Sequence, residues 1–349
     1  MNQFRALWES RDWPSLSRKR LSFGLTTAAV FFLLAHSSEG SKNPKEAIRA
    51  EGPPILWREP TDIATRNLYY GGGGKVHEPP ATLTFIEEDT ANASPKFEAV
   101  DDAGVHWKVK LGVEAKPETA VSRLVWAAGY FSNEDYFLPE VHVNKLPRLH
   151  RGNHFVSAGG TVHNVRLKRH SPGEKKLGTW AWGDNPFKGT REWNGLRVLM
   201  ALINNWDLKD INNSIYQVGG DRPEQRYMVS DLGASLGTTG LSRTLKGDLR
   251  SYEQSKWIDT VTADRIDFNV PSAPPAGYFL VVPIMVQRMD LRWIGRGIPR
   301  ADAKWIGELL SRLSPAQIRD AFRAAGYSAD EIERFSRVIE GRIQELKRL

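Results

Sequence analysis

Four polar side chains in the middle of the sequence have the types that phosphoryl transfer requires. Asp207, Lys209 and Asn212 lie close together, and Asp231 follows in a second acidic turn, Asp231-Leu232-Gly233. A carboxylate can orient or deprotonate a hydroxyl, an ammonium can stabilise charge on a transferred phosphoryl group, and carboxylate and amide oxygens suit Mg²⁺. We therefore expect Asp207 and Lys209 to be catalytic, and Asn212 and Asp231 to be metal ligands.

Each of these four residues also has an ordinary structural explanation when it is taken alone. The two aspartates could cap helices or turns, Lys209 could be a solvated surface charge, and Asn212 a turn residue. Their context favours a site, because residues 192–204 have helical spacing and lead directly into Asp207. Alternating residues on both sides of a Gly-Gly-Asp-Arg-Pro turn then predict a hairpin, which would bring Asn212 and Asp231 to adjacent strand ends.

Upstream of this site the sequence predicts a sheet and a helix. Segments 82–86, 96–100 and 105–111 have strand-like residues separated by turns, so they predict a three-stranded antiparallel meander. Pro117 suits the first turn of a helix, and an apolar stripe continues from it to Gly129. Two later segments, 140–143 and 161–168, alternate as further strands.

The order of these features resembles that of protein kinases. In the kinase pattern an Asp is followed two residues later by Lys and five residues later by Asn, and a later Asp-Phe-Gly supplies another metal ligand. Trp107-Lys108-Val109-Lys110 matches the apolar, any, apolar, Lys register of the kinase strand lysine. Residues 96–233 resemble the atypical protein-kinase-like superfamily, and they are more similar to the HipA, spore-coat CotH and secretory-pathway kinases than to eukaryotic-type kinases.

The resemblance implies an α+β, two-lobed protein-kinase-like fold, with an antiparallel N-lobe sheet, a mainly helical C-lobe, and ATP with Mg²⁺ or Mn²⁺ between the lobes. Lys110 would bind the nucleotide phosphates, with Lys108 on the same strand face as the alternative and Lys96 as a further candidate. Glu118, one residue after Pro117, would orient that lysine, and Glu114 is the alternative.

Several departures from the kinase pattern leave the acceptor open. Asn205-Trp206 replaces the usual His-Arg, Leu232 replaces Phe, and residues 92–96 stand where a glycine-rich loop would be. The acceptor could be a protein or a small molecule, and AMP transfer is an alternative reaction on this fold. The competing hypothesis is a non-catalytic, pseudokinase-like binding scaffold of the cell envelope. Such a scaffold would not require Asp207, Asn212 and Asp231 together.

Composition places the chain among ordinary globular proteins. Its 349 residues are 40% hydrophobic and 26% charged, which is enough to bury a large core. The net charge of +7 favours anionic partners such as nucleotides, but the basic residues are scattered, so we expect no nucleic-acid binding. The absence of cysteine excludes disulfides, thiolate metal sites and cysteine nucleophiles.

The N-terminus has the features of an export signal. Arg18-Lys19-Arg20 precedes a largely apolar run, Leu21–Ala35, which ends near small residues that suit cleavage before Ser38. At about 1.5 Å per residue this run is shorter than the roughly 30 Å hydrocarbon core, which favours a cleaved signal over an anchor. An uncleaved anchor, with membrane association through residues 21–35, and a buried helix are the alternatives. The sequence therefore predicts an exported (periplasmic or extracellular) or membrane-anchored protein.

These observations divide the chain into a signal peptide or anchor (1–37), a loop-rich lead-in (38–80), an N-lobe (81–170) and a C-lobe with C-terminal helices (171–349). In the last part, Ser314-Pro-Ala-Gln and Ser328-Ala-Asp-Glu are both capping boxes that predict helix starts. We expect the apolar face of the final helix to pack against the body of the protein, with a dimer seam as the alternative.

Overall fold

β-Strands dominate the first half of the fold and helices the last part. The structure, a computed structural model, describes residues 50–91, 94–239, 245–270 and 290–349, all of which belong to one compact unit. The predicted signal or anchor at residues 1–37, with its apolar run 21–35, lies outside the described residues. In the part of the chain that is described, no helix combines the length and apolar character that a membrane span needs.

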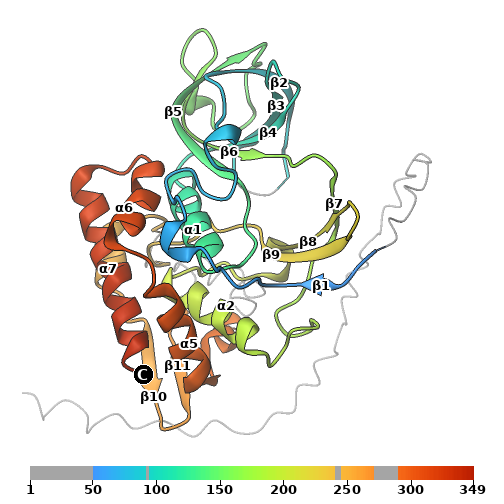
Figure 1. The fold of residues 1–349 in the computed structure, drawn as a ribbon. Coiled ribbons are helices and arrows are strands. Elements are labelled where there is room, and N and C mark those ends of the chain that lie inside the picture. Colours follow the sequence, from blue (N-terminus) through green and yellow to red (C-terminus); the bar gives the residue numbers. More distant parts are fainter. Residues whose placement is uncertain (1–49, 92–93, 240–244, 271–289) are drawn as a thin grey trace, which may run out of the picture. The chain divides into compact units, whose positions relative to one another are not determined.

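Five strands close into a barrel that forms the N-lobe (Figure 1). Strands β2, β3 and β4 form the predicted antiparallel meander, and β6 pairs antiparallel with both β4 and β5. A short parallel pairing of β2 with β5 closes the barrel, which the sequence pattern did not predict because it joins strands far apart in the chain. The strands are β2 (Thr82–Glu88), β3 (Lys96–Val100), β4 (His106–Leu111), β5 (Asp135–Asn144) and β6 (Thr161–Arg169).

Helix α1 (Ala115–Ala127) connects β4 to β5 and lies beneath the barrel (Figure 1). The helix contains Pro117 in its first turn, as the sequence predicted, and its apolar residues are buried against the C-lobe core. Gly129 ends the turn with φ 89°, and a Cβ there would lie 2.2 Å from the Arg58 carbonyl oxygen. Only glycine fits both the backbone conformation and this close approach.

A helix and a four-stranded sheet form the part of the C-lobe next to the barrel. Helix α2 (Arg191–Leu202) starts at Thr190, whose side chain accepts a hydrogen bond from the Trp193 amide. The sheet order is β1-β9-β8-β7, and β8 with β9 is the predicted hairpin. The lead-in segment contributes β1, which pairs parallel with β9. The strands are β1 (Pro54–Ile55), β7 (Glu174–Gly178), β8 (Asn213–Val218) and β9 (Glu224–Val229).

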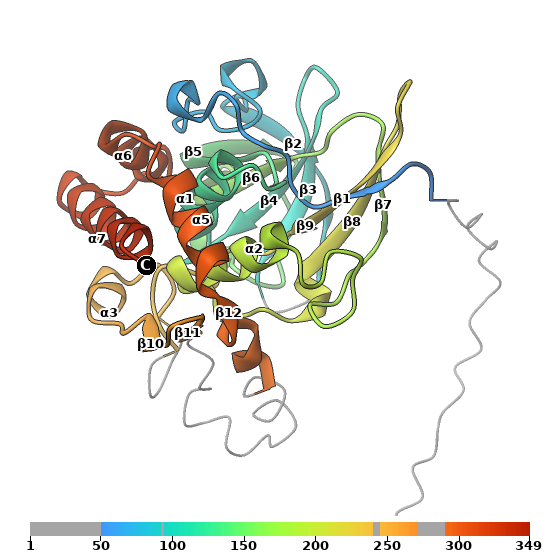
Figure 2. The same ribbon diagram turned by 60° about the horizontal axis from the view of Figure 1, so that its bottom comes forward.

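The C-terminal part is mainly helical (Figure 2). Both predicted capping boxes are present, at Ser314 and Ser328, and the last helix packs on α3, α5 and α6. Its apolar face is buried in the core, so this face packs within the chain and does not form a dimer seam. The elements are α3 (Leu249–Glu253), β10 (Ile258–Val261), β11 (Arg265–Phe268), β12 (Ile298–Pro299), α5 (Arg300–Leu310), α6 (Pro315–Ala324) and α7 (Ala329–Lys347).

The predicted fold class is confirmed: the described chain is α+β, with a strand-built N-lobe and a mainly helical C-lobe. Short 3₁₀ helices connect several of these elements. They are η1 (Ile63–Thr65), η2 (Lys75–His77), η3 (Asn153–Phe155), η4 (Asp210–Asn212) and η6 (Leu291–Gly295).

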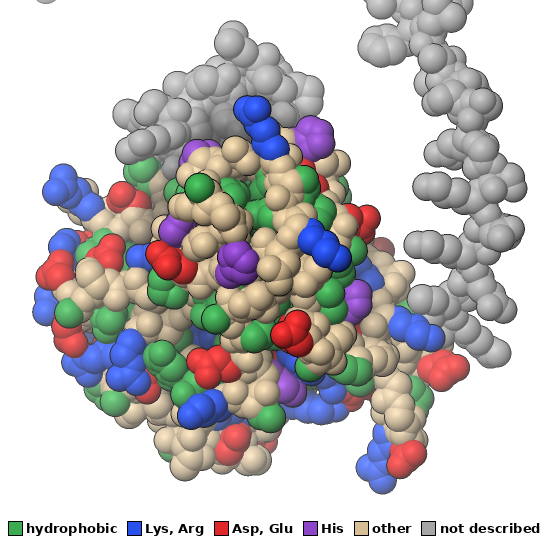
Figure 3. All heavy atoms as spheres, turned by 90° about the horizontal axis from the view of Figure 1, so that it is seen from above, with side chains coloured by type: hydrophobic (Ala, Val, Ile, Leu, Met, Phe, Trp, Pro, Cys, Tyr) green, Lys and Arg blue, Asp and Glu red, His purple; other side chains and the backbone are tan. Residues whose placement is uncertain are grey.

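Histidines mark the surface of the barrel that is seen from above (Figure 3). Four histidines on or next to the barrel strands each bond a separate neighbour: His142, His150, His163 and His170. The ring of His150 contacts Glu88 at 2.8 Å and the ring of His163 contacts Ser157 at 2.6 Å. Within the described residues, the group of metal-ligating side chains close enough to share an ion contains no histidine.

Arg342 on α7 holds the end of α2, where the chain enters the segment of Asp207. Its guanidinium donates to the Leu202 carbonyl at 2.6 Å, to Asn204 Oδ1 at 2.8 Å and to Ser255 Oγ at 2.8 Å. Asn204 has φ 52°, a left-handed conformation that Asn tolerates better than most residues. The last helix of the chain therefore fixes the conformation of the segment that precedes Asp207.

Replacing Arg342 with Leu should lower the free energy of unfolding by on the order of 3 kcal/mol, because several buried acceptors each lose a charged donor at once. Urea denaturation measures this change. Arg337→Leu, at an exposed position of the same helix, is the matched control and should change stability by no more than about 0.5 kcal/mol. Equal stability of the two variants would contradict the anchoring role of Arg342.

Candidate active site

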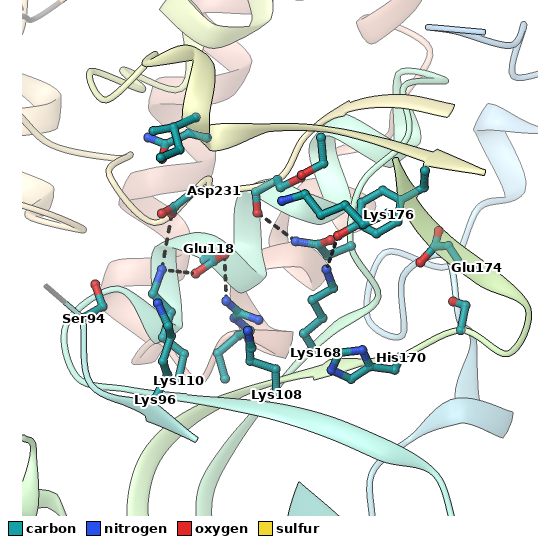
Figure 4. A pocket seen from close by; sticks show the side chains of 18 residues that line it. Ser94, Lys96, Lys108, Lys110, Glu118, Lys168, His170, Glu174, Lys176 and Asp231 are labelled. Atoms are coloured by element: carbon teal, nitrogen blue, oxygen red, sulfur yellow. Dashed lines mark hydrogen bonds and ion pairs between the residues drawn. The ribbon is translucent and has the colours of Figure 1, made fainter. Parts of the chain in front are cut away.

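A cavity of about 410 Å³ lies between the barrel and the β7–β8 part of the C-lobe (Figure 4). Its lining comes from β3, β4, α1, β6, β7 and β8, and from the turn that follows β9. Charged side chains dominate this lining. The cations are Lys96, Lys108, Lys110, Arg166, Lys168 and Lys176, and the carboxylates are Glu118, Glu174 and Asp231.

Lys110 is at the centre of the charged groups. Its Nζ lies 2.9 Å from Glu118 Oε2, 2.5 Å from Glu114 Oε2 and 3.3 Å from Asp231 Oδ1. Burial acts to lower the pKa of Lys110, but the negative charges of these three carboxylates raise it above its ordinary value. The lysine therefore stays charged, and it joins β4, the start of α1 and the turn after β9 through one ammonium group.

A second buried cation holds Glu118 from the other side. Arg166 on β6 donates from Nη2 to Glu118 Oε1 at 2.9 Å, and its Nη1 lies 3.3 Å from Asp135 Oδ1. Burial opposes the charge of Arg166, but Glu118 and Asp135 raise its pKa above the ordinary value. With both oxygens of Glu118 engaged by cations, its carboxylate is fixed in position beneath Lys110.

Glu114 connects the same cluster to the segment that follows Asp231. Its carboxylate contacts Lys110, Lys246 and the Ser94 hydroxyl. Burial acts to raise the pKa of Glu114, but Lys110 and Lys246 lower it to about 2. Glu114 and Glu118, which the sequence left as alternatives, thus both contact the lysine.

The segment of Asp207 and the turn of Asp231 are tied together through Asn212. The Asn212 side chain donates from Nδ2 to the Asp207 carbonyl at 2.6 Å, and the Asn212 carbonyl accepts from the amides of Ser230 at 2.8 Å and Asp231 at 3.2 Å. The two acidic segments predicted from the sequence therefore meet. Lys209 Nζ lies 3.1 Å from Asp207 Oδ1, and neither of these two residues lines the cavity.

Asn205 makes a second connection between these segments. Its Oδ1 accepts from the Asp207 amide at 3.1 Å, and its Nδ2 donates to the Asp231 carbonyl at 3.5 Å. Trp206, which stands where the kinase pattern has Arg, is buried and donates its amide to the Ala234 carbonyl at 3.2 Å. The departure from the usual sequence before Asp207 thus places a large apolar side chain in the core.

The other two lysines predicted to bind nucleotide have different partners. Lys108 Nζ lies 3.0 Å from Asp89 Oδ2 and 3.0 Å from Glu98 Oε1, and so it is not the lysine that contacts Glu118. Lys96 donates to the Ala91 carbonyl at 2.8 Å, and its Nζ lies 3.7 Å from Asp89. Both lysines line the cavity.

The free oxygens at the end of the β8–β9 hairpin fit a hard cation. Asp231 Oδ1 accepts from Lys110 and from the Gly233 amide, whereas its Oδ2 has no hydrogen-bond partner among the described residues. Asn212 uses its Nδ2, and its Oδ1 is unpartnered within the described ranges. Carboxylate and amide oxygens are the ligands that Mg²⁺ and Mn²⁺ favour. Glu114, Glu118 and Asp231 also lie close enough to share an ion, but Lys110 already contacts all three.

Sequence reasoning missed three members of this site. Arg166 was placed in a predicted strand without a role, although alternation already put it on one face with Lys168. Asp135 and Lys246 carried no signal, because their importance depends on the pairing of β5 with β6 and on the path of the chain after Asp231. These contacts join residues that are distant in the sequence.

Comparisons with known proteins show limited likeness. No family model and no curated protein sequence matches the chain. The solved structure of the Helicobacter pylori proinflammatory kinase CtkA is similar over 77% of this chain and 97% of its own, with 9% identity and a TM-score of 0.43. The Golgi casein kinase is similar over 82% of this chain and 78% of its own, with 11% identity and a TM-score of 0.33.

A second structure of the Golgi casein kinase, with Mn/ADP bound, is similar over 75% of this chain and 74% of its own, with 11% identity and a TM-score of 0.31. All of these scores are low, so the likenesses do not show what the chain does. The resemblance to HipA and CotH proteins stays a prediction from the sequence.

The pKa of Glu114 predicts a pH dependence of stability. A carboxyl whose pKa falls from 4.5 to about 2 on folding stabilises the folded protein above pH 4.5, and this contribution is lost as the pH falls toward 2. Glu114→Gln should therefore lose up to about 3 kcal/mol at neutral pH and show a smaller decrease in stability between about pH 5 and 3. Urea denaturation across this pH range is the measurement. Glu59→Gln, at an exposed position, should follow wild type, and parallel curves for wild type and Glu114→Gln would refute the assignment.

Proposed function

We propose that this chain is a metal-dependent phosphotransferase of atypical kinase type, which uses ATP with Mg²⁺ or Mn²⁺. The observation that carries the proposal is the buried contact of Lys110 with Glu118 and Asp231 at the edge of the cavity. Binding of a nucleoside triphosphate with its metal requires a lysine fixed by a glutamate and, next to it, an aspartate with a free carboxylate oxygen.

In this proposal the chain's own residues supply positioning and charge. Lys110 binds the phosphates of the nucleotide, and Glu118 is the positioning residue that holds Lys110. Asn212 and Asp231 hold the metal, which would neutralise phosphate charge when bound. The hydrogen bonds between the two acidic segments fix the distance from these ligands to Asp207.

The reacting groups lie on the segment between α2 and β8. Asp207 orients the acceptor hydroxyl and accepts its proton, and Lys209 stabilises charge on the transferred group. In the structure Lys209 forms an ion pair with Asp207, so the two proposed reacting groups lie side by side. The acceptor is a protein or a small molecule with a hydroxyl group. AMP transfer is the alternative reaction.

Export of the protein is part of the proposal and rests on the sequence alone. The basic cluster Arg18-Lys19-Arg20 before the apolar run 21–35 supports export of the rest of the chain across a membrane. The acceptor would then be found outside the cytoplasm, or at the membrane surface if the run is retained.

Purified full-length protein incubated with Mn²⁺ or Mg²⁺ and ATP labelled at the γ phosphate should transfer label to protein or release it as phosphate. Asp231→Ala should lower this rate by at least about a hundredfold, because the metal loses its charged ligand. Asp221→Ala, an exposed acid in the turn of the same hairpin, is the control and should keep the wild-type rate. Label transferred from α-labelled ATP instead would establish AMP transfer. If wild type bound no nucleotide with either metal, the enzyme proposal would be wrong and the scaffold alternative would stand.

Asp207→Asn should separate chemistry from nucleotide binding. The amide keeps the size of the side chain but cannot accept the proton, so kcat should fall by about 10²- to 10⁴-fold. The affinity for ATP should change by less than about threefold, since Asp207 does not line the cavity. Single-turnover transfer and equilibrium ATP binding give the two values. An unchanged kcat would remove Asp207 from the mechanism.

A further inference from the structure

The cleft has two different ends. At one end Glu118 forms ion pairs with Lys110 and Arg166, and Lys110 forms another with Asp231. Figure 4 shows Lys110, Glu118 and Asp231 together at this end. Lys108 is two residues from Lys110 on β4, and Lys168 is two residues from Arg166 on β6, so each shares a strand face with that residue. Lys108 and Lys168 therefore lie about 7 Å further along the cleft. Figure 4 shows Lys168, Lys176, His170 and Glu174 at this second end, away from Asp231.

The second end is not built to receive an apolar ring. The lining residues with an apolar side chain are Ile211, which is 66% exposed, and Tyr216. The ammonium of Lys168 donates to the Tyr216 hydroxyl at 3.0 Å and lies 5.1 Å from the centre of the ring. A flat base packed against this ring would therefore lie beside a charged group.

The excess positive charge of the cleft is at this end. Lys108, Lys110 and Arg166 each have carboxylate partners within ion-pair distance. Lys168 and Lys176 have no such partner among the described residues, although Glu174 lines the same end of the cleft. Burial raises the pKa of Glu174 even though Lys168 acts to lower it, and this single carboxyl lies beside two lysines.

Tyr216 lies between the two lysines. It is directly opposite Lys176 in the pairing of β7 with β8, where cross-strand side chains are neighbours. Its hydroxyl accepts from Lys168, which leaves its own O–H free to donate to a further group. Two ammonium groups and one hydroxyl therefore offer donors at the same place.

We propose that Lys168, Tyr216 and Lys176 form a second anion subsite, which binds a phosphate group at the end of the cleft away from Asp231. This inference extends the proposed function. It rests on that function only in assuming that the transferred phosphate binds at the Lys110 end of the cleft. The ligand of the cleft is then anionic at both ends. The second phosphate belongs either to the nucleotide or to a separate phosphorylated molecule.

Binding of inorganic pyrophosphate to the purified full-length protein, measured by calorimetry in the presence of EDTA, tests the subsite without the metal. Wild type should bind, and Lys168→Met and Lys176→Met should each weaken binding by about tenfold or more, because each removes a charge-assisted hydrogen bond. Tyr216→Phe should weaken binding less and keep the ring. Lys175→Met is the matched control: this exposed lysine is next to Lys176 on β7 but points to the other face, so the affinity should not change.

Wild-type affinity in both Lys168→Met and Lys176→Met would overturn the subsite, as would an equal loss in Lys175→Met or no binding to wild type. Lys176 is exposed and without a partner in the described residues, so Lys176→Met should fold. This variant therefore tests the subsite even if Lys168→Met fails to fold. Asp231→Ala should still bind pyrophosphate without metal. Failure of label transfer together with intact, lysine-dependent pyrophosphate binding would therefore refute the phosphotransferase and leave the subsite standing.

A second arm repeats the titration with saturating ATP and Mg²⁺. Displacement of pyrophosphate by ATP assigns the subsite to the nucleotide, and continued binding assigns it to a separate molecule. Either result supports the subsite, provided that Lys168→Met and Lys176→Met remove the binding.

Discussion

The buried ammonium of Lys110 is the group on which the arrangement of the site depends. Through it the barrel, α1 and the turn after β9 share one set of charges. Ion pairs join three cations, Lys110, Arg166 and Lys246, to four carboxylates, Glu114, Glu118, Asp135 and Asp231. Taking one partner out of such a cluster leaves an uncompensated buried charge, which costs about 3–5 kcal/mol.

Exposure within this cluster also indicates which carboxylate a further cation could reach. The Asp231 side chain is 42% exposed, whereas that of Glu118 is 1% exposed. A divalent cation can therefore reach Asp231, whereas Glu118 is enclosed by protein. The same cluster thus explains why Lys110 is fixed and why the metal proposal centres on Asp231.

Much of the fold could be predicted from the sequence because its signals are local. The alternation of β2, β3 and β4, the two capping boxes and the hairpin between Asn212 and Asp231 depend on neighbouring residues. What the sequence could not give depends on contacts between distant segments: the parallel pairing of β2 with β5, the position of Arg166 beside Glu118, and the link from Glu114 to Lys246. Strand alternation put Lys108 and Lys110 on one face and could not choose between them; the choice needs the position of α1 relative to β4.

The C-lobe supports the site from the opposite direction. Arg342 and Tyr252 both donate to the Leu202 carbonyl, each at 2.6 Å, at the point where α2 ends and the segment toward Asp207 begins. Folding of the last helix and the conformation of the segment before Asp207 are therefore coupled.

The proposal depends above all on a metal held by Asp231 and Asn212 beside the phosphates bound by Lys110. Electron paramagnetic resonance of Mn²⁺ titrated into the protein with ATP tests it most directly. The account predicts bound Mn²⁺ in wild type and in Asp221→Ala, with binding lost in Asp231→Ala and weakened in Asn212→Ala. Equal Mn²⁺ binding in all four proteins would contradict it.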